Sequence, residues 1–170
     1  MKHGSHAYLS ARHAGVPLQL LIDHFAGHRL PERQVHQALH RFALWCAEHT
    51  PGAAPPSTGV LLSAVRAHLA GRLSDADRHQ LTASFKGATI AAAVVGLKHN
   101  CTNAPSLLSA YMCLAYDGPE AARRTVYWGV IGAHLTALKE GQDPERAVRL
   151  WCERAREKLL EIVDGMAQTQ

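Results

Sequence analysis

Histidines are concentrated near the start of the chain, where eight of the twelve fall within the first fifty residues. Four of them form two pairs with four-residue spacing, His24 with His28 and His36 with His40, on either side of residues 29–32. Because residues four apart lie on one face of a helix, each pair is arranged to bind a single ion. A helical hairpin turning between the pairs would bring all four imidazoles together.

These imidazoles are suited to a transition-metal ion, which needs several ligand atoms held about 2.0–2.3 Å from its centre. We therefore predict a metal site formed by His24, His28, His36 and His40, with zinc, copper or nickel as the ion and Glu32 as an alternative ligand. The competing interpretation is that the four histidines border a solvent-exposed hairpin and that the protein binds no cofactor.

Motifs for catalysis are missing from the sequence. It contains no His-Glu-x-x-His motif, no pair of Glu-x-x-His motifs and no glycine-rich phosphate loop. Many of the fourteen carboxylates lie at expected helix starts or alternate with basic residues along the last expected helix, which is typical of a solvated face. We therefore name no catalytic residue and expect a non-enzymatic protein. The cysteines form no Cys-x-x-Cys pair, and we expect unpaired thiols in a reducing cytosol.

The elements that must position these residues are helices. Apolar residues recur with a period near 3.6, and no stretch shows the sustained period of two that indicates a strand. The chain of 170 residues is predicted to be a single all-α domain over 1–170, with residues 1–15 as a flexible N-terminal segment. We expect about seven helices in antiparallel hairpins, forming a compact helical bundle or short helical array without a β-sheet. They are expected at residues 17–28, 31–49, 58–70 and 74–98, and from residues 103, 117 and 143 onward.

Three of the expected helix starts carry capping signals. Ser74 precedes Asp77 by three residues, as in a capping box. Asp117 and Asp143 are each followed by a proline and an early glutamate, so both are predicted to cap the next helix. Near the end of the helix expected at 74–98, residues 91–97 are apolar on every face, and we predict this segment to be the buried centre of the fold.

Charge and hydropathy limit the partners that the chain can bind. The net charge is +4, and residues 51–100 carry five Lys or Arg against two Asp or Glu, which permits an acidic partner without requiring one. The first fifteen residues lack the apolar core of a signal peptide, and the longest apolar run, residues 88–97, is too short to cross a bilayer. We therefore expect a cytoplasmic protein that does not bind membranes.

A nucleic acid is an alternative partner. Residues 17–49 would form a helix-turn-helix whose second helix presents Arg33, Gln34, Gln37 and Arg41 to a DNA groove. These four polar residues lie away from the apolar stripe of the same helix. A DNA-binding regulator therefore stays open beside the metal-binding and protein-binding interpretations.

Two segments resemble a family of predicted bacterial immunity proteins: residues 42–49, FALWCAEH, and residues 62–71, LSAVRAHLAG, separated by a proline-rich loop. The resemblance covers about residues 38–80 and implies a small, alanine-rich, all-helical protein that binds and neutralises a toxin. No functional residue is carried over, because Cys-Ala-Glu-His and Ala-x-Arg-Ala are short motifs and the family's dense alanine–histidine repeats are missing here. The basic charge also argues against a basic nuclease as the target.

The favoured hypothesis from the sequence is a non-enzymatic, cytoplasmic protein-binding module. It would act as an inhibitor or immunity-type protein, binding a protein partner or a second copy of itself through a helical surface. The alternatives are a DNA-binding transcriptional regulator that uses residues 17–49 and a metal-binding protein that uses the histidine hairpin.

Overall fold

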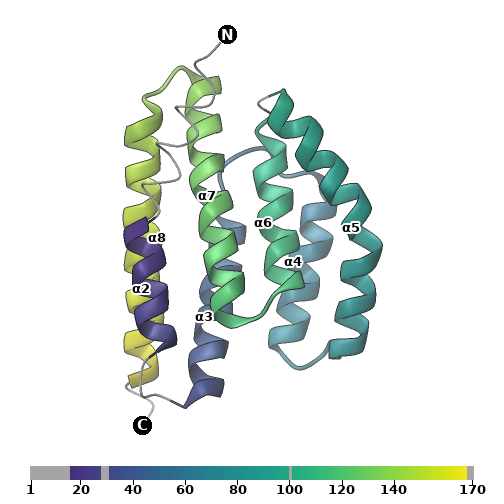
Figure 1. Cartoon of the computed structure of the whole chain (residues 1–170), viewed down its shortest axis with the longest axis vertical. Helices are drawn as coiled ribbons and strands as arrows, with labels where there is room; N and C mark the ends of the chain where they lie inside the picture. Colours follow the sequence, from purple (N-terminus) through teal and green to yellow (C-terminus); the bar gives the residue numbers. More distant parts are fainter. Residues whose placement is uncertain (1–15, 28–30, 100, 168–170) are drawn as a thin grey trace.

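The computed structural model describes residues 16–27, 31–99 and 101–167. Within these ranges the chain forms α-helices and no β-strand, which confirms the predicted all-α class (Figure 1). The segment predicted to be flexible, residues 1–15, lies outside the described residues. The helices are α2 (Val16–Ala26), α3 (Glu32–Glu48), α4 (Pro56–Leu69), α5 (Asp75–Lys98), α6 (Asn103–Ala115), α7 (Gly118–Glu140) and α8 (Pro144–Ala167).

Local sequence signals determine where several helices begin. At the start of α5, Ser74 Oγ accepts the Asp77 backbone N–H at 3.1 Å and donates to the Asp77 carboxylate at 2.6 Å, so the predicted serine cap is confirmed. Asp143 caps α8 by accepting two backbone N–H groups at 2.9 and 3.3 Å. Asp117 is the N-cap residue of α7, as predicted, but its side chain makes no capping hydrogen bond, because its carboxylate binds Arg78 instead.

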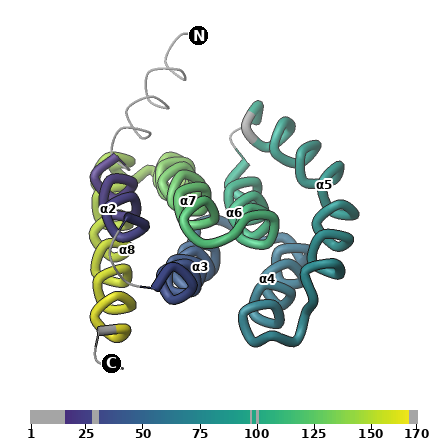
Figure 2. Tube along the Cα trace, turned by 60° about the horizontal axis from the view of Figure 1, so that its bottom comes forward, coloured from purple at the N-terminus to yellow at the C-terminus, as the bar shows by residue number. Residues whose placement is uncertain are grey.

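The core lies between α3, α6 and α7, which pack against one another at the centre of the array. Helices α2 and α8 lie on one side of this centre, whereas α4 and α5 lie on the other (Figures 1 and 2). The central helices contribute large side chains that are fully buried, among them Leu39, Phe42, Leu114 and Val126. Burial of this apolar surface is the main stabilising contribution to the fold.

The prediction that residues 91–97 form the buried centre is wrong. Helix α5 lies at the edge of the array, where it packs against α6 and, less closely, α4, and it contacts no other described helix (Figure 2). Ile90, Val94 and Val95 are 51%, 64% and 57% exposed. Only one face of this apolar segment packs against α6, so its other apolar faces are exposed to solvent.

Glycines permit two close helix contacts. A Cβ atom added at Gly129 of α7 would overlap the Trp151 ring of α8, and one added at Gly96 of α5 would overlap Ala104 of α6. These positions therefore set how closely the paired helices approach. Among the helices described, none is both long and apolar enough to span a bilayer.

Candidate functional site

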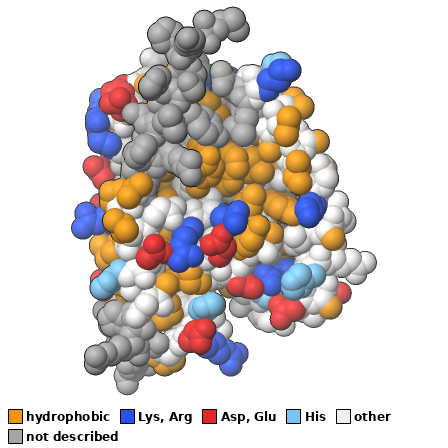
Figure 3. Space-filling view, in the orientation of Figure 1, with side chains coloured by type: hydrophobic (Ala, Val, Ile, Leu, Met, Phe, Trp, Pro, Cys, Tyr) orange, Lys and Arg blue, Asp and Glu red, His pale blue; other side chains and the backbone are white. Residues whose placement is uncertain are grey.

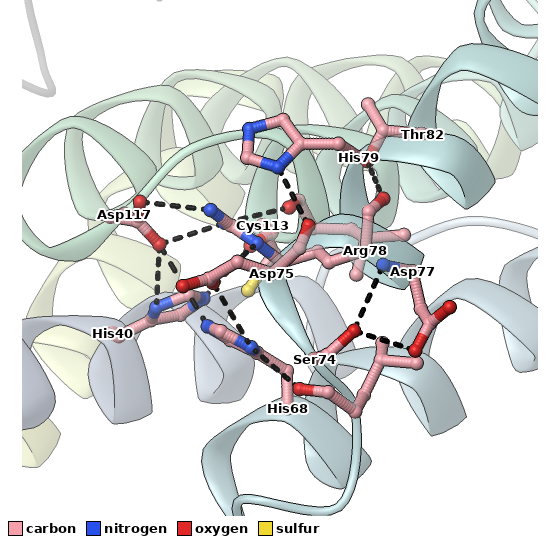
Figure 4. Close-up of polar contacts among 12 residues, drawn as sticks. His40, His68, Ser74, Asp75, Asp77, Arg78, His79, Thr82, Cys113 and Asp117 are labelled. Carbon is pink, nitrogen blue, oxygen red and sulfur yellow. Dashed lines mark hydrogen bonds and ion pairs between the residues drawn. The ribbon is translucent and has the colours of Figure 1, made fainter.

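Two histidines and one aspartate converge where α3, the end of α4, the start of α5 and the α6–α7 turn meet (Figure 4). One ligand atom from each of His40, His68 and Asp117 lies within 4.8 Å of the other two. Among the residues that the structure describes, this is the only group of three or more His, Cys, Asp or Glu that could hold one ion. We call it the His40–His68–Asp117 cluster.

His40 is the buried member of the cluster, with a side chain that is 5% exposed. Its Nε2–H donates to the Cys113 carbonyl at 2.9 Å. Since a carbonyl only accepts, Nδ1 carries the free lone pair, and Nδ1 lies 3.8 Å from Asp117 Oδ1. Burial lowers the pKa of His40; the Cys113 bond and Asp117 oppose this effect, while His68 and Arg78 add to it. The ring is therefore neutral at pH 7.

His68 lies at the end of α4 with its side chain 20% exposed. Its Nδ1 faces two acceptors, the Leu73 carbonyl at 3.5 Å and Asp75 Oδ1 at 3.9 Å, and the tautomer with its proton on Nδ1 satisfies these contacts. Its Nε2 lies 3.9 Å from Asp117 Oδ1. The centres of the His40 and His68 rings are 5.8 Å apart. Both histidines therefore direct one ring nitrogen toward the same carboxylate oxygen.

Asp117 connects the two histidines to a buried arginine. Arg78 Nη1 and Nη2 donate to Asp117 Oδ1 and Oδ2 at 2.8 and 3.0 Å, and Nη1 also donates to the Leu114 carbonyl at 3.2 Å. The Arg78 side chain is 5% exposed and that of Asp117 is 56% exposed. The cluster is therefore closed on the arginine side and reachable from solvent on the aspartate side.

The described members of the predicted four-histidine site lie in different surroundings. His40 belongs to the cluster, whereas His36 is half-exposed, 3.9 Å from Glu32, and His24 is exposed near the end of α2. His28 lies outside the described residues. Among the described members of the predicted set, no three lie close enough to share an ion. The four-histidine site stays a prediction.

The residues predicted to contact DNA all lie on the surface of α3. Arg33, Gln34, Gln37 and Arg41 are exposed, while the opposite face of the helix packs into the core. This orientation is the one that the helix-turn-helix interpretation requires. DNA binding itself stays a prediction.

The sequence interpretation did not identify His68 and Asp117 as members of a site. His68 follows His40 by 28 residues and Asp117 follows His68 by 49, so no local spacing links them. One available signal was charge: residues 78–116 contain no Asp or Glu, and Asp117 is the first carboxylate after this stretch. A buried arginine at its start would be expected to pair with that carboxylate.

A second surface feature is the outer face of α5. Lys86, Ile90, Val94 and Lys98 follow one another at four-residue intervals and are all exposed, so they form one line along the helix, which we call the α5 strip. Figure 3 shows hydrophobic side chains along the upper part of α5, with basic side chains above and below them. Beside the strip lies a groove of about 370 Å³ between α5 and α6. Its mainly apolar lining includes Ala88, Ala92, Val95, Gly96, Ala104 and Leu107.

Comparison of the chain with protein-family models, curated proteins and solved structures finds no match.

Proposed function

We propose that this protein is a non-enzymatic protein-binding module that recognises an acidic amphipathic helix through the α5 strip and the adjoining groove. The observation that carries this proposal is the exposed apolar surface of α5. Ile90 and Val94 are 51% and 64% exposed, and Val95, at 57%, also lines the groove. A continuous exposed apolar surface beside a groove is typical of a site that accepts a helix of a partner.

The basic ends of the strip define the chemistry of the bound helix. Lys86 and Lys98 bracket Ile90 and Val94, and twelve residues of helix separate the two lysines by about 18 Å. A partner helix of about three turns would place apolar residues on Ile90 and Val94 and a carboxylate near each lysine. The apolar contacts would supply affinity, and the two charge pairs would fix register and direction.

The surroundings of the strip favour an acidic partner over a basic one. Residues 78–116, which include most of α5 and all of α6, contain three basic residues and no Asp or Glu. A carboxylate on the partner therefore meets no like charge from residues 78–116, and the two carboxylates of α5, Asp75 and Asp77, lie in its first turn, away from the strip. A basic helix would be repelled by both lysines without finding a compensating acid there.

A second copy of the chain fits this face poorly. Two α5 helices packed antiparallel would place Lys86 of one copy near Lys98 of the other, and like charges in a desolvated interface are unfavourable. A membrane surface is also disfavoured, because interfacial helices insert Trp, Phe or Leu. The exposed apolar side chains of the strip are Ile and Val instead.

The biological role that we propose is inhibition of a cytoplasmic partner, as in an immunity-type protein. The resemblance of residues 38–80 to predicted immunity proteins supports this role, and α5 begins within that segment. A module that binds an exposed helix of another protein blocks whatever that helix must contact. The mild basic charge of the chain selects targets with an acidic surface.

Peptide display on the immobilised full-length protein tests the proposal. Enriched peptides should be helical, with an apolar face flanked by Glu or Asp about three turns apart. Synthetic copies should bind at least about tenfold more weakly to Val94→Ser, because the apolar contact is lost. The double variant Lys86→Glu/Lys98→Glu should reverse the preference toward peptides with lysine at both ends.

Leu138→Ser in α7 is the matched control, since Leu138 is also an apolar residue that is 51% exposed; peptide affinity should stay within about twofold of the wild type. The proposal fails if no helical peptide is enriched or if the charge-reversed variant keeps the original preference. It also fails if the protein sediments with vesicles of phosphatidylserine and phosphatidylcholine through Val94, because the strip would then bind lipid.

A further inference from the structure

We propose that the His40–His68–Asp117 cluster is a binding site for a divalent transition metal of the zinc type. The site is separate from the α5 strip: it lies at the beginning of α5, whereas the strip occupies the second half of the helix. A negative result for the metal site would therefore leave the protein-binding proposal unaffected, and the reverse also holds.

Two ring nitrogens of the cluster face one carboxylate oxygen, which is an arrangement that favours a bound cation. His40 donates its Nε2–H to the Cys113 carbonyl, and His68 directs Nδ1 toward the Leu73 carbonyl. With one proton on each ring at these nitrogens, His40 Nδ1 and His68 Nε2 present lone pairs toward Asp117 Oδ1. These three facing atoms are all acceptors. Such an arrangement repels itself unless a cation or a proton lies between the groups.

The hydrogen bonds from the two histidines to backbone carbonyls resemble the outer contacts of a metal site. Metal-binding histidines donate the other ring N–H to a carbonyl or carboxylate, which fixes the tautomer and the ring orientation. His40 has this contact at 2.9 Å, and His68 has a longer one at 3.5 Å.

The distances need only a small adjustment. Ligand atoms about 2.0–2.1 Å from a tetrahedral ion are about 3.4 Å from one another. The two histidine nitrogens lie 3.8 and 3.9 Å from Asp117 Oδ1. Because all three ligand atoms lie within 4.8 Å of one another, side-chain shifts of about 1 Å or less close the site. The exposed side of Asp117 leaves a fourth position for water.

The ligand types favour zinc, cobalt, nickel or copper over calcium and magnesium. Two imidazoles and one carboxylate match the preferences of divalent transition metals, whereas calcium and magnesium prefer oxygen ligands alone. Arg78 and the metal ion would both contact Asp117 Oδ1. This carboxylate oxygen has two lone pairs, so one lone pair can accept the guanidinium hydrogen bond while the other faces the ion. The positive charge of Arg78 lowers the affinity for a cation. We therefore expect weaker binding than at a structural zinc site.

Titration of the full-length, untagged, chelator-treated protein with Co²⁺ tests the proposal. One equivalent of Co²⁺ should bind with the intense visible absorption of a tetrahedral site, and Zn²⁺ should displace it. His68→Ala and Asp117→Asn should each weaken this binding at least about tenfold, because each variant removes a ligand. His36→Ala, which changes the exposed histidine one turn before His40, should leave it within about twofold.

Nitrogen-15 NMR of the wild-type histidines provides a test that requires no substitution. Zn²⁺ should shift the resonances of His40 Nδ1 and His68 Nε2, while the other nitrogen of each ring keeps its proton. The proposal is overturned if less than a tenth of an equivalent binds or if His68→Ala binds like the wild type. It is also overturned if the shifted nitrogens belong to His24, His28 and His36, since the metal would then occupy the hairpin site.

Discussion

Arg78 and Asp117 lie 39 residues apart in the sequence and form a bidentate ion pair. This pair connects the first turn of α5 to the turn between α6 and α7. The guanidinium is buried and the carboxylate is half-exposed, so the pair closes one side of the His40–His68–Asp117 cluster. The same pair orients Asp117 Oδ1 toward both imidazoles. The stability of the edge helix and the geometry of the candidate metal site therefore depend on one contact.

Asp117→Asn should destabilise the metal-free protein. Removing one partner of a fully buried pair costs about 3–5 kcal/mol, and the solvent exposure of Asp117 reduces the expected loss to about 1–3 kcal/mol. The loss arises because Arg78 stays buried without a counter-charge. Urea unfolding measures it. Asp143→Asn is the control, since asparagine caps a helix as well as aspartate does, and it should change the free energy of unfolding by less than about 0.5 kcal/mol. Equal effects of the two substitutions would contradict this role for Arg78–Asp117.

Stability should fall when the pH falls below about 6.5. Burial lowers the pKa of His40 and also that of His134 in the folded protein. At pH values between the unfolded-state pKa and the lower folded-state pKa, the unfolded chain binds more protons than the folded chain, so lowering the pH favours unfolding. Above the unfolded-state pKa the histidines are neutral in both states, and they no longer contribute to the pH dependence of stability. Urea unfolding in chelator from pH 8 to pH 5 measures the slope. His40→Asn should reduce it, whereas His36→Ala should not, and an unchanged slope in His40→Asn would be the contrary outcome.

The sequence predicted individual helices well because their boundaries depend on local chemistry. The helix expected at 31–49 is found at Glu32–Glu48, and the one expected at 74–98 is found at Asp75–Lys98. Proline can occupy the first helical position without losing a needed hydrogen bond, and a serine cap satisfies free backbone N–H groups. Such signals act within a few residues and need no tertiary contact.

The roles of similar residues were harder to predict because they depend on the tertiary fold. Asp117 and Asp143 stand in nearly the same local sequence, yet only the Asp143 side chain forms capping hydrogen bonds. The difference arises because Arg78, distant in sequence, reaches Asp117 and binds its carboxylate. Likewise, the apolar run at residues 91–97 indicates a helix, but the run does not show how many other helices pack against it. The position of His68 in the cluster also depends on the tertiary fold, because packing of α4 beside α3 brings this residue close to His40.

Gly129→Ala should destabilise the protein by about 1–3 kcal/mol, because the added methyl group overlaps the Trp151 ring. The ring cannot easily move, since its Nε1–H donates to the His49 carbonyl at 3.0 Å. Gly87→Ala in α5 is the matched control: nothing lies within 4 Å of the added Cβ. Alanine also favours a helix, so this control should raise stability by about 0.5–1 kcal/mol. Thermal unfolding compares the two, and the same sign for both would show that the α7–α8 contact is looser than described.

The thiols should differ strongly in reactivity toward a disulfide reagent such as Ellman's reagent at pH 8. Cys46 and Cys113 are fully buried, and burial raises the pKa of both. Burial, with a smaller contribution from Glu153, raises the pKa of Cys152 to about 11. Cys101 is partly exposed and lines the groove beside the α5 strip, so it should react first.

Cys101→Ser should therefore abolish the fast phase of this reaction, whereas Cys152→Ser should leave it unchanged, and all thiols should react once urea unfolds the chain. The same reaction reports on the groove. An acidic helical peptide seated against α5 and α6 covers Cys101, so it should slow the fast phase in proportion to its occupancy. It should have no such effect in Val94→Ser at the same peptide concentration. A peptide that binds without protecting Cys101 would place the contact elsewhere on the protein.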